Sequence, residues 1–160
     1  MLAVPHMLVG AAVGKTLKRP ALALPVAFGS HFLLDALPHL DTHGLFGVAG
    51  GSVTRPEAAM AILDFLFGAA LVIWLAARLP NRRTILLSAL AAILIDLVDN
   101  VPPWSGWFRA CRIGSWVSAF HHGFQHNVTP DHWLLGLGTQ AAAITAALLV
   151  FLRSRRGKEC

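Results

Sequence analysis

Residues 57–79 read EAAMAILDFLFGAALVIWLAARL, a stretch in which Glu57, Asp64 and Arg78 are the only charged residues. At about 1.5 Å per residue, a helix of this length crosses a hydrocarbon core roughly 30 Å thick. The whole chain agrees: 56% of its 160 residues are hydrophobic, 13% are charged, and the mean hydropathy is +0.62. A soluble domain carries about a quarter of its residues as charged side chains. The composition therefore excludes a soluble module and indicates an integral membrane protein.

Four further apolar stretches lie on either side of this one, at about 2–17, 21–37, 84–101 and 131–152. No internal repeat and no low-complexity linker separates them, so we expect one all-α integral membrane domain over residues 1–160. The expected architecture is polytopic, with about five helices that span the membrane wholly or in part. A short interfacial helix over 116–126 is expected beside them, with Trp116, Phe120 and Phe124 on its apolar face.

The net charge of +5 predicts the orientation of the chain in the membrane rather than a nucleic-acid partner, because the basic residues form clusters and no stripe. Basic loops stay in the cytoplasm, and three clusters therefore define the inner face: Lys15, Lys18 and Arg19; Arg78, Arg82 and Arg83; Arg153, Arg155, Arg156 and Lys158. The N-terminus and the loops 38–56 and 102–130 then face outward. Four tryptophans mark the outer boundary and one the inner boundary, as interfacial anchoring predicts: Trp104, Trp107, Trp116 and Trp133, and Trp74.

Given this orientation, all eight histidines and all six aspartates fall on the outer half of the molecule. The segment His31-Phe-Leu-Leu-Asp35 places an imidazole and a carboxylate on one helix face, one turn apart. Such a pair can bind one cation, or the carboxylate can orient the imidazole. Pro38 is expected to end or kink the helix, and further donors follow it: His39, Asp41 and His43.

A second group of donors comes from the other outer loop and from the membrane helices. His121, His122 and His126 lie within six residues, and Asp96 lies near the outer end of the fourth apolar stretch. Nitrogen and carboxylate ligands together suit zinc, with manganese or iron next. We therefore predict one or two metal ions in a site drawn from these residues: His6, His31, Asp35, His39, Asp41, Asp96, His121 and His126.

Three patches of the chain resemble the LexA-regulated inner-membrane proteins that are assigned as metal-dependent hydrolases. That family carries an early His, a Leu-Pro-Asp-x-Asp-His turn and a His-Arg-Gly-x-Thr-His-Ser segment. The matching positions are His6, Leu37-Pro38-His39-Leu40-Asp41, and His121-His122-Gly123-Phe124-Gln125-His126-Asn127. His39 stands where the family has Asp, and His122 where it has Arg. The resemblance implies a multi-pass protein of a bacterial inner membrane with a hydrolytic metal site.

The expected activity is hydrolysis of a phosphoester or related bond in a lipid-borne substrate at the outer face of the membrane. In this reading Asp99 or Asp64 accepts a proton, since an intramembrane carboxylate is a functional candidate. Anionic headgroup contacts are expected from Arg109, Arg112 and His122. Three alternatives stay open: a metal or proton transporter, a non-catalytic membrane protein with a structural metal site, and haem ligation by two histidines. A transporter needs polar residues that continue to the inner face, and the sequence has few of them there. This favours a site open to one side of the membrane over a transport path.

Overall fold

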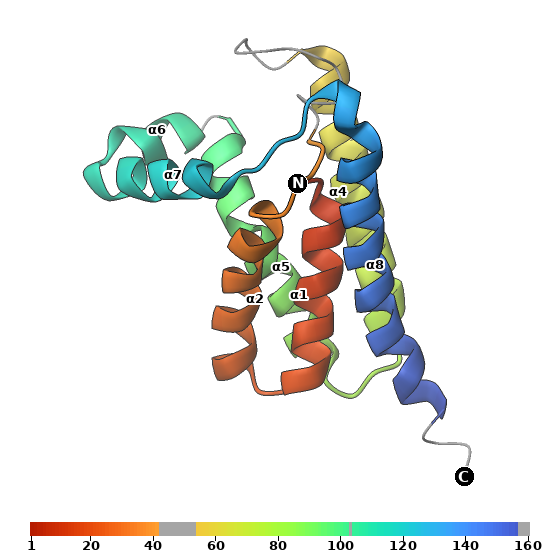
Figure 1. Ribbon diagram of the computed structural model, residues 1–160. Coiled ribbons are helices and arrows are strands. Elements are labelled where there is room, and N and C mark those ends of the chain that lie inside the picture. The colour runs from red at the N-terminus through yellow and green to blue at the C-terminus, as the bar shows by residue number, and fades with distance from the viewer. Residues whose placement is uncertain (42–53, 103, 157–160) are drawn as a thin grey trace.

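The computed structural model describes residues 1–41, 54–102 and 104–156 (Figure 1). Over these residues the chain is helical, without strands, so the expected all-α class is confirmed. One isolated parallel bridge joins His39 to Asn127. His43 lies outside the described residues. The helices are α1 (Ala3–Leu17), α2 (Pro20–Asp35), α4 (Arg55–Ala76), α5 (Arg82–Asn100), α6 (Trp104–Ala110), α7 (Arg112–Phe124) and α8 (Trp133–Arg156), with a 3-10 turn η1 (Pro130–His132) before α8.

Helix α1 occupies the centre of the bundle, with α2, α4, α5 and α8 packed around it (Figure 1). Small residues let the backbone of α5 approach α1 closely. A Cβ atom at Gly10 would lie 2.5 Å from Cβ of Ala92 and 2.6 Å from the Ser88 carbonyl oxygen. Gly14, four residues on, meets α5 in the same way. This Gly-x-x-x-Gly spacing is typical of helices that associate inside membranes, where van der Waals contact between backbones drives packing.

The outer surfaces of the bundle are apolar. On α4, Leu63 and Phe67 are 66% and 62% exposed, and on α8 Leu134 is 69% exposed. Contiguous apolar surface of this kind is rare on soluble monomers. Large apolar side chains, whose exposure to water is unfavourable, thus point away from the helix bundle, as they do in a protein surrounded by lipid.

Two helices are long and apolar enough to cross a membrane: α4 over its 22 residues and α8 over Trp133–Arg153. Helices α5 and α6 would make a third span if the pair, bent by 83°, counts as one. The expectation of about five spans is therefore confirmed only in part among the described residues. Helices α1 and α2 have 15 and 16 residues, which gives them only about 22 to 24 Å of length, short of a 30 Å core.

Helices α6 and α7 form a lateral arm, residues 104–124, that projects sideways from one end of the bundle (Figure 1). Helix α7 exposes Ile113, Trp116 and Phe120 and buries Gly114, Ser118 and His121, so it is amphipathic, as expected of an interfacial helix. It ends at Phe124, however, and not at residue 126 as expected, so His126 lies outside the helix that carries His122. The turns between α1 and α2 and between α4 and α5, which carry the basic clusters, lie at the opposite end of the bundle (Figure 1).

Candidate metal centre

Six ionisable side chains meet at the end of the bundle from which the lateral arm projects. They come from α1, the C-terminal end of α2 and the loop after it, α5 and α7, and each residue is fully buried: His6, His31, Asp35, His39, Asp99 and His121. Asp96 of α5 borders them with its side chain 26% exposed. Burying charge at this density is costly unless the groups are paired or bind a cation. Among the described residues, buried His and Asp groups with the spacing to hold a metal ion are therefore present, as expected.

Asp35 lies at the middle of the cluster, and its two oxygens face different partners. Oδ2 lies 3.0 Å from His31 Nε2 and 3.5 Å from His121 Nε2. Oδ1 lies 3.1 Å from His6 Nε2, 2.9 Å from the Met1 amino group and 3.8 Å from His39 Nε2. The helical spacing of His31 and Asp35, read from the sequence as one face of α2, thus places both side chains in the same site.

Three of the imidazoles are oriented by a hydrogen bond at Nδ1. Nδ1 of His31 lies 2.7 Å from the Ala92 carbonyl oxygen, Nδ1 of His39 2.8 Å from the Leu37 carbonyl oxygen, and Nδ1 of His121 3.1 Å from Asp99 Oδ2. These oxygens can only accept, so the hydrogen-bond pattern assigns the proton to each Nδ1. A neutral ring then presents a lone pair at Nε2, as in metal-binding histidines whose other ring N–H donates to a carbonyl or carboxylate oxygen.

The Nε2 atoms of His31 and His121 lie 3.1 Å apart. Two lone pairs at this distance repel each other unless a proton or a cation lies between them. Asp35 Oδ2 completes a triangle with the two nitrogens, and Asp96 Oδ1 lies 3.5 Å from His121 Nε2 and 3.8 Å from His31 Nε2. His31, Asp35 and His121 thus offer three atoms close enough to bind the same ion, and Asp96 lies beside two of them.

Several buried atoms of the cluster have no hydrogen-bond partner among the described residues: His6 Nδ1, Asp35 Oδ2 and His39 Nε2. Leaving such an atom unsatisfied costs about 1–3 kcal/mol. Burial lowers the pKa of His39, which keeps its ring neutral. Burial also acts to lower the pKa of His121, but the Asp35 and Asp99 carboxylates beside it outweigh burial and raise that pKa. The donor set and its unsatisfied atoms fit a bound cation.

Asp99, expected as a proton acceptor, is instead surrounded by donors. Its Oδ1 accepts from Arg109 Nε at 2.6 Å, and its Oδ2 accepts from Ser118 Oγ at 3.0 Å and from His121 Nδ1. Arg109, expected to contact substrate, is thus committed to Asp99. The sequence analysis missed Ser118, although its spacing of three residues from His121 on an amphipathic helix was a usable signal.

The other predicted site residues lie outside this cluster. Asp64 of α4 accepts a hydrogen bond from the Ala3 backbone N–H and so caps the start of α1. Asp41 accepts from Asn127 Nδ2 at 2.8 Å. The His126 side chain is exposed, and only its backbone reaches the site, through hydrogen bonds to Asp35 and His39. Arg112 is exposed at the first residue of α7.

His122 borders the cluster from the exposed side of α7. Its side chain is 47% exposed, and its Nδ1 lies 2.8 Å from the Ser118 carbonyl oxygen and 3.4 Å from Asp99 Oδ2. Together with Asp99 and His121 it forms another group of possible metal ligands, beside the group around Asp35. Since the oxygens of Asp99 already accept three hydrogen bonds, this group is less suited to a cation than the one around Asp35.

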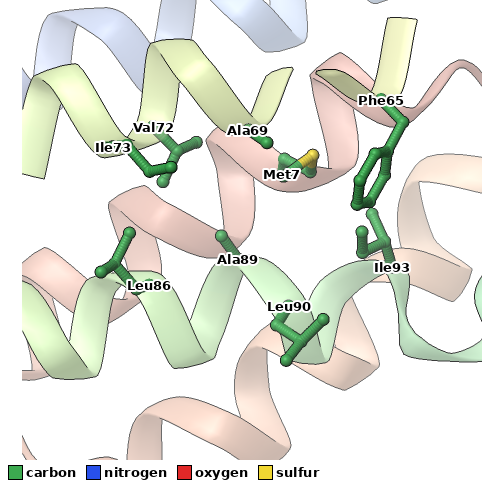
Figure 2. Close-up of a pocket in the computed structure, with 9 residues that line it drawn as sticks. All are labelled: Met7, Phe65, Ala69, Val72, Ile73, Leu86, Ala89, Leu90 and Ile93. Carbon is green, nitrogen blue, oxygen red and sulfur yellow. The ribbon is translucent and has the colours of Figure 1, made fainter. Parts of the chain in front are cut away.

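A separate groove of about 190 Å³ runs between α4 and α5, and Met7 of α1 forms part of its floor (Figure 2). Its walls are apolar, with Phe65 and Ile93 facing each other at one end and Ile73 and Leu86 at the other (Figure 2). None of the residues that line it has an ionisable side chain. The groove is therefore part of the apolar surface of the bundle and not of the centre.

The chain was compared with protein-family models, with curated proteins and with solved structures, and none of the three comparisons found a match.

Proposed function

We propose that the protein is a membrane-embedded, metal-dependent hydrolase whose centre binds zinc through His31, Asp35 and His121. The observation that carries this proposal is the 3.1 Å separation of two Nε2 atoms whose Nδ1 protons are both already donated. Zinc ligands lie about 2.0–2.1 Å from the ion, so two ligands of a tetrahedral site are about 3.3 Å apart. The three distances among His31 Nε2, His121 Nε2 and Asp35 Oδ2, from 3.0 to 3.5 Å, bracket that value.

Three protein ligands leave one coordination position for water or substrate, which is the pattern of catalytic rather than structural zinc. Bound zinc supplies a water of lowered pKa and polarises a phosphoryl oxygen. Of the carboxylates near the ligands, Asp96 is the most accessible, with its side chain 26% exposed. Its Oδ1 accepts from Asn100 Nδ2 at 3.2 Å and lies 3.5 Å from His121 Nε2 and 3.8 Å from His31 Nε2. In our proposal Asp96 therefore accepts the proton, a role that the sequence analysis gave to Asp99 or Asp64.

We place the centre at the outer surface of a bacterial-type inner membrane, with all five bundle helices inserted and α1 and α2 as partial spans. The basic turns at the opposite end then lie in the cytoplasm, and the aromatic face of α7 lies in the lipid headgroup region. A substrate carried by a lipid reaches a site at this depth without leaving the membrane. The resemblance to inner-membrane hydrolases at His6, 37–41 and 121–127 supports the same function.

A headgroup contact is available from His122 but not from the two arginines expected for it. Arg109 is held by Asp99, and Arg112 lies nine residues before His121 on α7, about 13 Å along the helix. His122 is half-exposed next to Ser118. We therefore propose His122 for the anionic headgroup and Arg112 for the phosphates of surrounding lipid.

The proposal is tested by elemental analysis of the metal content of protein purified without a metal-affinity tag. One zinc per chain is expected in the wild type and in His126→Ala and His132→Ala, whose exposed side chains make them matched controls. Loss of the metal is expected in His31→Ala and His121→Ala. Release of phosphate from phospholipid and polyprenyl diphosphate vesicles should follow the metal and fall at least 100-fold in Asp96→Asn.

A wild-type protein without metal would refute the hydrolase, and the facing nitrogens would then share a proton instead, as in a proton-relay site. Metal retained with no hydrolysis of either lipid class would leave a structural metal site.

A further inference from the structure

The lateral arm is joined to the bundle through the carboxylate of Asp99. Arg109 of α6 donates from Nε to Oδ1 at 2.6 Å, and a second guanidinium nitrogen donates to the Asp99 carbonyl oxygen at 2.5 Å. His121 of α7 donates from Nδ1 to Oδ2 at 3.1 Å, and Ser118 donates to the same oxygen at 3.0 Å. One fully buried carboxylate of α5 thus holds both helices of the arm.

This arrangement leaves Asp99 little capacity to bind a cation or accept a proton itself. Three side-chain donors already use its two oxygens, and one of them is the guanidinium of Arg109. What the carboxylate does instead is fix the ring of His121. In the neutral ring, donation from Nδ1 to Asp99 leaves the lone pair on Nε2, directed at His31 and Asp35.

We propose that Asp99 is the positioning residue of the centre: held by Arg109, it sets the tautomer and orientation of His121, so that docking of the lateral arm completes the metal site. This inference rests on the proposed function, because it assumes that His121 Nε2 binds the metal. His31 and Asp35 belong to α2, whereas His121 is the one ligand of the three that the arm supplies. An arm that is not docked therefore leaves the site with two of its three ligands.

The substitution Asp99→Asn tests the role because it keeps the shape of the side chain while it removes the charge that pairs with Arg109 and changes the hydrogen bond to His121. The amide nitrogen of Asn is a donor. If it faces His121 Nδ1, it favours the tautomer with the proton on Nε2, and a protonated Nε2 has no lone pair with which to bind the metal. Loss of the group that accepts the other ring N–H of a metal-binding histidine typically costs about 10–100-fold in metal affinity. We expect losses of this size in Asp99→Asn and Arg109→Gln, a smaller loss in Arg109→Lys, which keeps the charge, and none in Arg112→Gln, the matched control on the arm.

Cobalt(II) titrated into the full-length, detergent-solubilised protein measures affinity, and its visible absorption spectrum reports the coordination geometry. The expected result is weaker binding and an altered spectrum in Asp99→Asn, at unchanged helix content by circular dichroism. Wild-type affinity and spectrum in Asp99→Asn would overturn the proposal. Unchanged cobalt binding with lost hydrolysis would also overturn it, since Asp99 would then be the proton acceptor after all.

A second readout needs no metal and separates this inference from the proposed function. Nitrogen-15 NMR of histidine-labelled protein, at alkaline pH where the ring is neutral, reports which nitrogen of His121 carries the proton. We expect Nδ1 in the wild type and Nε2 in Asp99→Asn. If the wild type binds no metal, the proposed function fails, yet this tautomer change still supports the positioning role. A proton on Nδ1 in both proteins would refute it.

Discussion

Gly10→Ala tests the close approach of α1 and α5 on which the centre depends. The added Cβ would lie 2.5 Å from Ala92 Cβ and 2.6 Å from the Ser88 carbonyl oxygen, whereas carbon atoms in contact are about 3.5–4.0 Å apart. The helices must therefore separate locally by about 1 Å. Overpacking of this kind costs about 1–3 kcal/mol, and the higher helix propensity of Ala offsets up to about 1 kcal/mol. We expect a net loss of about 1–2 kcal/mol.

Thermal unfolding in a mild detergent, followed by circular dichroism, measures the effect. For a chain of this size, the upper value of about 2 kcal/mol corresponds to a Tm about 4–8 °C lower. The matched control is Gly29→Ala on α2, where an added Cβ meets nothing within 4 Å and only the gain in helix propensity, up to about 1 kcal/mol, is expected. If Gly10→Ala unfolds at or above the temperature of Gly29→Ala, the reasoning about this contact is wrong.

The same substitution should reach the metal centre. Ala92, which the new methyl group would contact, supplies the carbonyl oxygen that accepts from His31 Nδ1 at 2.7 Å. A local shift of α5 lengthens that hydrogen bond and loosens His31. Cobalt affinity is therefore expected to fall in Gly10→Ala and to stay at the wild-type value in Gly29→Ala.

Three further substitutions test single features of the structure. Asp64→Ala should lower the stability by about 1 kcal/mol, because it leaves the Ala3 N–H at the start of α1 without its acceptor. Asp64→Asn keeps an acceptor and should retain both stability and hydrolysis. A folded but inactive Asp64→Asn would restore the catalytic role that the sequence suggested. Lys15→Met should destabilise the protein by about 1–3 kcal/mol in thermal unfolding, because Lys15 Nζ donates to the carbonyl oxygens of Val150 and Phe151 at 2.7 and 3.0 Å; an unchanged Tm would mean that these bonds contribute nothing. Trp116→Phe should remove a large share of the tryptophan fluorescence that brominated lipids quench at the headgroup level, because Trp116 is 75% exposed on α7; undiminished quenching would argue against an interfacial α7.

Local periodicity was enough to find the part of the centre that lies on one helix. His31 and Asp35 are four residues apart, so a helix necessarily brings them to one face, and both reach the site. Asp96 was predicted as a site residue because a carboxylate inside a membrane helix is energetically costly and is therefore a functional candidate. These predictions needed no knowledge of how the helices pack.

Which of the histidines in 121–126 enter the site depends on where α7 ends, and local sequence pattern predicts the ends of helices poorly. Because α7 stops at Phe124, the His126 side chain turns to solvent while its backbone pairs with Asp35 and His39. His121, which was predicted together with His126, does lie in the site. The contact between Asp99 and Arg109 was likewise not predicted, since which partner a carboxylate meets depends on a bend between α5 and α6 that the composition does not reveal.

Taken by itself, the sequence determined that this is an all-helical, apolar chain with its histidines and aspartates gathered towards one end, because hydropathy and helical spacing are properties of neighbouring residues. Only the tertiary structure decided which of those side chains form a single centre. The atoms that meet there come from residues as far apart as His31 and His121, and their distances follow from the Gly10 contact between α1 and α5 and from the docking of the lateral arm on Asp99. Contacts between distant segments fix such distances, and local sequence pattern carries no record of them.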